Sequence, residues 1–206
     1  NQDGTKIIDK IDIGESKLGW NPSWSPDGNH IAFVDDDVRL KVVDIRDKTI
    51  KTIDVGGINL ERGSIQMKWS PDSKWIAYSK TGDNMLRQIY IWSTELNTSR
   101  AITDPFADSF SPAWDLNNKQ LYFLASTNIA LGSGWANTSS IMANETYAAY
   151  VVNLDIEDKS PFEPKSDEEE LSENKSEKIK KVKKDVPDKT KGSSVKIDFK
   201  NISRRT

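Results

Sequence analysis

Apolar and polar positions repeat along the chain in three similar stretches. The first, NPSWSPDGNHIAF, places a tryptophan and a tight turn before an apolar run, and MKWSPDSKWIAYS and PAWDLNNKQLYFL follow the same pattern. Aligned without a gap, the stretches match Trp24 with Trp69 and Trp114, which lie 45 residues apart. Pro, Asp and Gly are preferred in reverse turns, and β-branched and aromatic residues favour strands. Each stretch therefore predicts two strands joined by a tight turn.

The turn changes its residues between repeats while its predicted geometry stays the same. SPDG becomes SPDS and then DLNN, so that Asn118 stands where the first repeat has Gly28. Asparagine tolerates the left-handed backbone conformation better than most residues other than glycine. We therefore expect the same turn in all three repeats.

Further apolar runs extend each repeat to four strands. A third run follows each hairpin, and a fourth follows in the first two repeats: LKVVDI, QIYIWS and YAAYVVNL, then TIKTIDV and SRAITD. A period of about 40–45 residues with several short strands is typical of a β-propeller. HIAFV and WIAYS are apolar on both faces, as expected for a sheet packed between two neighbours. The predicted fold is all-β: a partial β-propeller of four-stranded antiparallel blades with a 45-residue repeat.

The pattern divides the chain into three parts. Residues 1–163 are predicted to form about three and a half blades, with TKIIDKIDIG as the outer strands of a preceding blade. Residues 164–194 are rich in Lys, Asp and Glu without an aromatic residue, which predicts a disordered, flexible linker. Residues 195–206 regain alternation and are predicted to be the first strand of a following domain, a second propeller. A propeller of 4–8 blades closes into a ring, so we expect this chain to be a piece of a longer protein.

Composition narrows the classes of function. The chain has 206 residues, 35% of them apolar, a net charge of −3 and no cysteine, which excludes disulfides and thiolate chemistry. No apolar run is long enough for a membrane span, so no membrane partner is expected. The lysines of KIKKVKK could bind nucleic acid, but eight acids share that segment and no aromatic residue is there to stack on bases. No nucleic-acid partner is expected.

The sequence offers little for catalysis. His30, the only histidine, aligns with Trp75 and Gln120 and is predicted to pack between blades. Asp35 to Asp37 could hold a hard cation, but the other repeats lack matching acids, so a solvated turn is expected. No phosphate loop, nucleophile elbow or zinc motif is present. We therefore assign no catalytic, cofactor-binding or metal residue and no cofactor.

The third repeat carries a long insertion, TNIALGSGWANTSSIMANE, with Trp135 in a predicted loop. Long insertions in repeat proteins often carry function. From FLASTNIALGSGW through SPFEPKSDEEE, the chain resembles the last blade and exit of the six-bladed propeller of tricorn-type serine peptidases. VKIDFKNISRR resembles the segment that opens the second propeller of that family. The resemblance covers nearly all of the chain except the linker.

The resemblance implies a non-catalytic propeller portion of a peptidase that degrades oligopeptides. Its role would be substrate access and scaffolding, with catalytic residues in later domains of the parent chain. It further implies a homo-hexamer, and we expect a cytoplasmic location, with the periplasm as the alternative. WSPDG repeats also occur in Tol-system propellers, which bind proteins, and in the propellers of prolyl-oligopeptidase relatives. Both remain alternatives, and the sequence beyond Thr206 would distinguish them.

Overall fold

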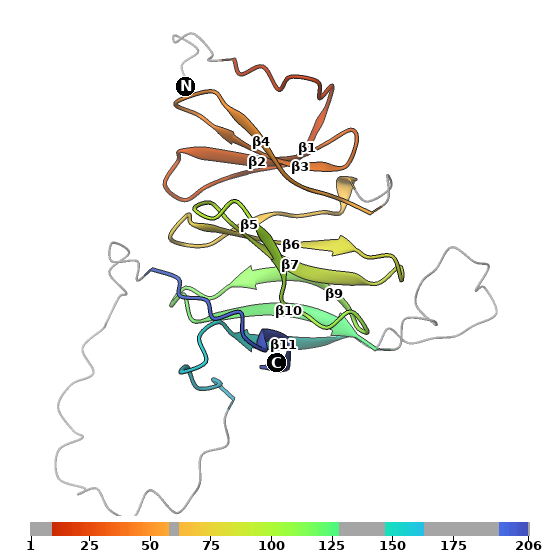
Figure 1. Ribbon diagram of the computed structural model, residues 1–206, viewed down its shortest axis with the longest axis vertical. Coiled ribbons are helices and arrows are strands. Elements are labelled where there is room, and N and C mark those ends of the chain that lie inside the picture. The colour runs from red at the N-terminus through yellow and green to blue at the C-terminus, as the bar shows by residue number, and fades with distance from the viewer. Residues whose placement is uncertain (1–9, 58–61, 128–146, 163–193, 206) are drawn as a thin grey trace, which may run out of the picture.

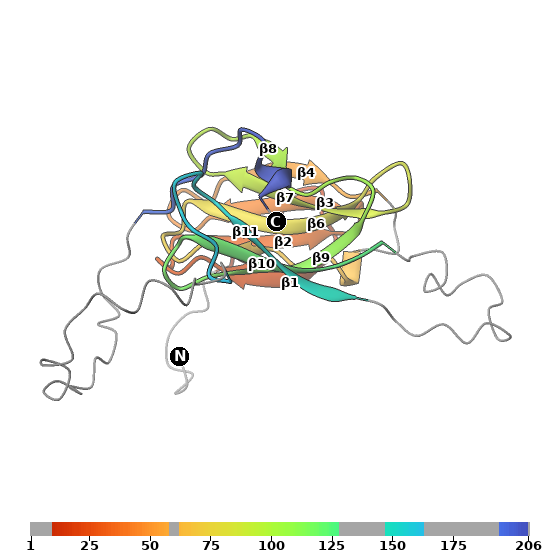
Figure 2. The same cartoon turned by 90° about the horizontal axis from the view of Figure 1, so that it is seen from below.

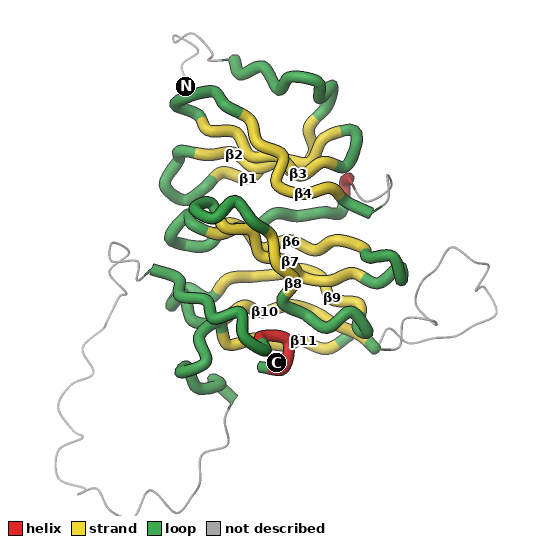
Figure 3. The backbone as a smooth tube through the Cα atoms, viewed as in Figure 1, coloured by secondary structure: helices red, strands yellow, loops and turns green. Residues whose placement is uncertain are grey.

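The computed structural model describes residues 10–57, 62–127, 147–162 and 194–205. Three antiparallel sheets are stacked face to face along the long axis of the molecule (Figure 1). Apart from two short 3-10 segments, at residues 62–63 and at Ile202–Arg204, the elements shown in Figure 3 are strands and the loops between them. The protein is therefore all-β, as the sequence predicts.

Each sheet is one blade, with its strands in sequence order. The first blade contains β1 (Gly19–Trp24), β2 (His30–Asp35), β3 (Arg39–Asp44) and β4 (Ile50–Val55). The second contains β5 (Lys68–Trp69), β6 (Trp75–Thr81), β7 (Arg87–Ser93) and β8 (Ser99–Ala101). The third contains β9 (Asp108–Trp114), β10 (Gln120–Ser126) and β11 (Ala148–Asn153). Figure 2 shows β1 and β9 at one edge of the stack and β4 and β8 at the opposite edge.

The three repeats of the sequence are repeats of the structure. The tryptophan of each first strand pairs with the same position of the second strand: Trp24 with Ile31, Trp69 with Ile76 and Trp114 with Leu121. The turns also agree, because Gly28, Ser73 and Asn118 have φ of 73°, 62° and 62°. Left-handed backbone is uncommon for residues other than glycine. The predicted turn geometry is confirmed in all three repeats.

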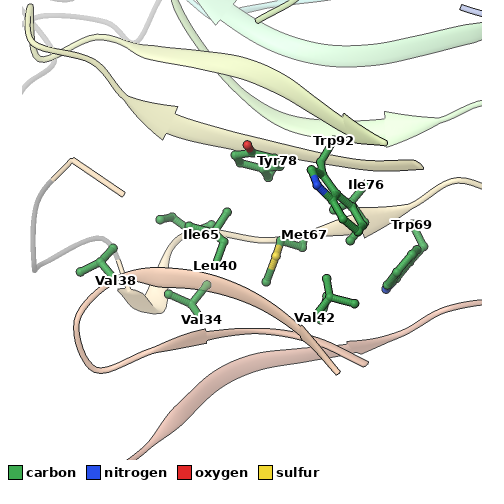
Figure 4. Packing of buried hydrophobic residues seen from close by; sticks show 11 residues of the cluster. Val34, Val38, Leu40, Val42, Ile65, Met67, Trp69, Ile76, Tyr78 and Trp92 are labelled. Carbon is green, nitrogen blue, oxygen red and sulfur yellow. The ribbon is translucent and has the colours of Figure 1, made fainter. Parts of the chain in front are cut away.

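The core lies between the blades. Residues of β2 and β3 pack against the second blade, and Figure 4 shows Val34, Leu40 and Val42 facing Met67 and Tyr78. A second cluster joins the second and third blades through residues such as Ile91 and Leu121. Sheets covered on both sides need apolar residues on both faces, which explains why WIAYS, in the second blade, does not alternate. HIAFV lies in the first blade, where Val34 faces the second blade and Ile31 and Phe33 line an open hollow.

Two stretches predicted as strands are not strands where the structure describes them. Residues 10–13 of TKIIDKIDIG form no strand, and the first five residues of that stretch lie outside the described residues. Residues 194–205 pair with no described strand and contain the 3-10 helix near their end. Alternation sets which side chains can face a core, whereas a strand also needs a partner for its backbone groups. The charged linker and the insertion with Trp135 lie outside the described residues. No helix within the described parts of the chain is long and apolar enough to span a bilayer.

Candidate functional site

Neighbouring blades are joined by a repeated tryptophan contact. The indole nitrogen of Trp69 donates a hydrogen bond of 3.1 Å to the carbonyl of Ser23, and that of Trp114 donates one of 2.8 Å to Lys68. Trp69 is 8% exposed, whereas Trp24 is 59% exposed because the described residues place no blade before it. The three tryptophans thus share a register, but Trp24 does not share the environment that the repeat alignment predicts.

A hollow of about 640 Å³ lies where the first strands of the three blades end. The three repeat tryptophans line it, together with two prolines of the turns and one of β9: Trp24, Trp69 and Trp114, then Pro26, Pro71 and Pro112. Leu116 is 89% exposed beside it. Lys68 is the only charged residue among those that line this hollow. The hollow therefore offers aromatic and apolar surface with one cation.

A polar hollow of about 270 Å³ adjoins the first one and shares Ser23 and Lys68 with it. It lies between β1 and the segment before β5, and Asn21 and Gln66 contribute amide groups to its wall. The Asn21 amide donates to the carbonyls of Gly63 and Ile65 at 2.9 and 3.0 Å. Together, the two hollows present apolar and hydrogen-bonding surface along one edge of the blade stack.

His30 lies in the interface between the first two blades. Its ring centroid is 5.8 Å from that of Trp69, and its Nε2 lies 3.5 Å from a carboxylate oxygen of Asp44. Its Nδ1 is buried without a hydrogen-bond partner. His30, Trp75 and Gln120 each begin the second strand of a blade. This is the packing position that the repeat alignment predicts.

The prediction of a solvated turn at Asp35 to Asp37 is wrong for Asp35, whose side chain is 0% exposed. Its carboxylate accepts hydrogen bonds from the Ser16 hydroxyl at 2.8 Å and the Arg39 Nε at 2.7 Å, and lies 3.0 Å from the Lys41 Nζ. Burial raises the pKa of Asp35, but hydrogen bonds from the Arg39 backbone, Ser16, Lys41 and the Arg39 side chain outweigh it and lower the pKa to about 2. The group ties residues 15–16 to the first blade.

Ion pairs and hydrogen bonds also cross between blades at Asp54. Its carboxylate accepts a hydrogen bond of 2.6 Å from the Tyr78 hydroxyl and lies 2.9 Å from the Lys80 Nζ. Between the second and third blades, the Arg87 guanidinium pairs with Asp108 at 2.5 Å. Burial, then the charge of Asp54, raises the pKa of Tyr78 far above its usual range. These groups hold the blades together. Their contacts do not form the set typical of nucleophilic catalysis, in which a general base activates a nucleophile and a third group orients the base.

No group of three or more metal-ligating side chains gathers within the described ranges. We did not identify Asp35, Asp54 and Asp108 from the sequence as carboxylates that hold the fold together, because their partners come from other parts of the chain. A signal did exist for Asp35: Arg39 and Lys41 follow it at alternate positions of the next strand. The described residues thus provide two adjoining hollows at one edge of the blades and a set of contacts that hold the blades together.

Comparison with known proteins relates this chain to tricorn-type peptidases. Tricorn protease homolog 1 of Streptomyces coelicolor is 33% identical over 102 residues, which are 49% of this chain and 9% of that protein. The uncharacterized peptidase YuxL of Bacillus subtilis is 27% identical over 135 residues, which are 63% of this chain and 20% of that protein. No family model matches the chain.

The crystal structure of the tricorn protease superposes with a TM-score of 0.57 at 16% identity, covering 91% of this chain and 16% of that one. This match and the three stacked blades confirm the predicted partial β-propeller. The resemblance to the propeller of tricorn-type peptidases is also confirmed. The chain spans at most a fifth of the length of each of these three proteins.

Proposed function

We propose that this chain is a non-catalytic β-propeller portion of a tricorn-type serine peptidase that degrades oligopeptides. The observation that carries the proposal is the 33% identity over 102 residues to a tricorn protease homolog. The packing of His30 against Trp69 and beside Asp44, between the first two blades, supports a structural role for this side chain. The catalytic residues of the parent enzyme would lie in its remaining domains.

The two adjoining hollows support a role in substrate access. They lie along the first strands of the blades, the edge that surrounds the central channel when blades form a ring. Trp114 and Leu116 would contact apolar side chains of a passing oligopeptide, and Lys68 would attract its carboxylates. Such contacts would act on long peptides, which must pass the propeller, more than on short ones.

The test uses the full-length protein with Leu116→Glu, which places a charge on the apolar hollow without touching the core. The kcat/KM for a peptide of about ten residues should fall at least about threefold, while that for a tripeptide stays unchanged. Leu96→Glu is the matched control, because Leu96 is also exposed but lines neither hollow. Equal effects on both peptides, or no peptidase activity in the full-length protein, would contradict the proposal.

We further propose that the parent protein is cytoplasmic and assembles as a homo-hexamer with its other domains. The support is the family resemblance alone. Sedimentation of the full-length protein would test the assembly, and cell fractionation would test the location.

A second candidate is the propeller of another peptidase class, favoured by the 135-residue match to YuxL. That reading predicts an α/β-hydrolase region with a Gly-x-Ser-x-Gly elbow after the blades. The third candidate is a freestanding propeller of the Tol-system type that binds other proteins. Sequencing the gene beyond the codon for Thr206 distinguishes all three.

A further inference from the structure

Residues 194–205, here called the clasp, lie against the second and third blades (Figure 1, dark blue). Val195 and Ile202 are 5% and 4% exposed, and both belong to the apolar cluster that joins these blades. Their neighbours in that cluster include Ile102, after β8, and Leu154, after β11. The clasp thus fills part of the interface between two blades.

Polar contacts fix both ends of the clasp. The backbone N–H of Val195 donates 2.8 Å to the carboxylate of Asp72, in the turn of the second blade. At the other end, Asp198 N–H donates 2.9 Å to the carbonyl of Leu154, which also accepts a bond of 3.2 Å from the Arg205 guanidinium. These contacts reach two different blades, so the clasp bridges them.

Phe199 lies between the two ends of the clasp. Its ring centroid is 6.1 Å from that of Trp75, and the Arg100 guanidinium lies 4.9 Å from the ring centroid. The Lys196 Nζ adds an ion pair of 2.6 Å with Asp155. An aromatic ring held between an indole and a guanidinium is an arrangement found at binding hot spots.

The clasp lacks the backbone ladder that holds each blade strand. The first two blades have a fourth strand, β4 or β8, whereas the sheet of the third blade contains only three in the described residues. Instead of a ladder, a few side chains and four hydrogen bonds or ion pairs to the blades hold the clasp. Segments bound in this way behave as peptide ligands with anchor residues.

We propose that the surface formed by Asp72, Trp75, Arg100, Leu154 and Asp155 is a peptide-binding groove, and that the clasp is its exchangeable ligand in cis. The ligand is a short segment with a β-branched residue, an aromatic residue four positions later and an isoleucine three positions after that. A basic residue completes it three positions further on. This site lies apart from the hollows assigned to substrate access and is independent of that function.

Covalent connection makes binding of the clasp intramolecular, which raises its effective concentration at the groove. The groove is therefore filled by the clasp in the intact chain. A peptide with the same pattern, from this chain or from another protein, would compete for the site once the connection is cut.

The experiment uses the full chain with a protease site inserted between residues 175 and 176. After cleavage, the C-terminal piece should stay bound through size-exclusion chromatography at about 50 µM. Adding excess fluorescent peptide of residues 194–206 to the cleaved protein should displace that piece and raise the anisotropy of the dye. The uncut chain should bind the peptide at least about tenfold more weakly.

The substitutions are made in the added peptide, so they cannot change the folding of the protein that binds it. Phe199→Ala should weaken binding at least about tenfold, whereas Lys200→Ala, at an exposed position, should leave it unchanged. Loss of the piece on cleavage would overturn the proposal, because its own contacts would then not hold it. A piece that stays bound but never exchanges would overturn it as well, since the clasp would then be a fixed part of the fold.

Discussion

The Trp69 indole donates a hydrogen bond to the carbonyl of Ser23 in the preceding blade, and Trp114 makes the same contact with Lys68. In both pairs the partners are 46 residues apart. Because the contact recurs at the repeat spacing, it fixes how one blade docks on the next. Trp69 and Trp114 therefore set how the second blade packs on the first and the third on the second.

Trp69→Ala should lower the free energy of unfolding by about 3–5 kcal/mol, because it removes a large buried side chain. Trp69→Phe keeps an aromatic ring and should cost less, mainly for the carbonyl of Ser23 that loses its donor. Trp24→Ala is the control, and its exposure predicts a change below about 1 kcal/mol. Urea unfolding followed by far-UV circular dichroism measures all three. Similar losses for Trp24→Ala and Trp69→Ala would contradict the docking role.

The sequence predicted the blade strands and turns because the information for them is local. Turn residues and apolar runs recur in each repeat, and the structure places Gly28, Ser73 and Asn118 in the same backbone conformation. Trp24 shows the limit of this reasoning. Its register follows from its own repeat, but its exposure depends on whether another blade packs against it.

Other features depend on partners distant in sequence. Asp35 looks like part of an acidic turn until Ser16 and Lys41 are brought beside it. The alternation of Val195, Ile197 and Phe199 correctly indicates an apolar side, since Val195 is buried. It cannot reveal that none of the described strands forms a backbone ladder with this segment.

Asp35→Asn should destabilise the protein at pH 7 by about 3–5 kcal/mol, because it leaves Lys41 buried beside a neutral group. The native pKa of about 2 lies below that of an unfolded aspartate. Between about pH 4 and 2 the unfolded state therefore binds more protons, and the stability from this carboxylate is lost as the pH falls. Unfolding curves from pH 7 to 2 should show the two proteins converging. A constant difference across that range would contradict the assigned pKa.

Tyr78 should stay protonated in the folded protein at pH values where exposed tyrosines ionise, because burial and Asp54 raise its pKa. Absorbance at 295 nm reports tyrosine ionisation, and the contribution of Tyr78 should appear only as the protein unfolds. Tyr78→Phe should remove that late step and cost about 1–3 kcal/mol, since Asp54 loses a donor. Tyr122→Phe is the control and should leave the late step in place. Ionisation of Tyr78 in the folded protein near pH 10, the ordinary pKa of tyrosine, would contradict this assignment.

The isolated chain should show no peptidase turnover. His30 is the only imidazole, and its ring packs against Trp69 with Nδ1 buried. Fluorogenic oligopeptides provide the assay, and His30→Ala provides the diagnostic variant. Turnover that disappears in His30→Ala would show that the catalytic group lies in this chain after all.

The isolated chain of 206 residues should also self-associate, because the outer face of the first blade is apolar and open. A hollow of about 200 Å³ on this face is lined by Ile11, Ile13, Ile31, Phe33 and Val43, among others. Trp24 is exposed at the position where the later repeats dock on a preceding blade. Exposed apolar surface of this kind marks interfaces or aggregation sites.

Trp24→Glu should shift the isolated chain toward the monomer, because burying the new carboxylate in a contact between copies is costly. Leu96→Glu makes the same charge change at an exposed site in the turn after β7 and should leave the association unchanged. Light scattering over a concentration series up to about 100 µM distinguishes the outcomes. If the unmodified chain stays a monomer of 23.2 kDa throughout, the open face is not an interface. Equal shifts in the two variants would instead assign the association to net charge rather than to this face.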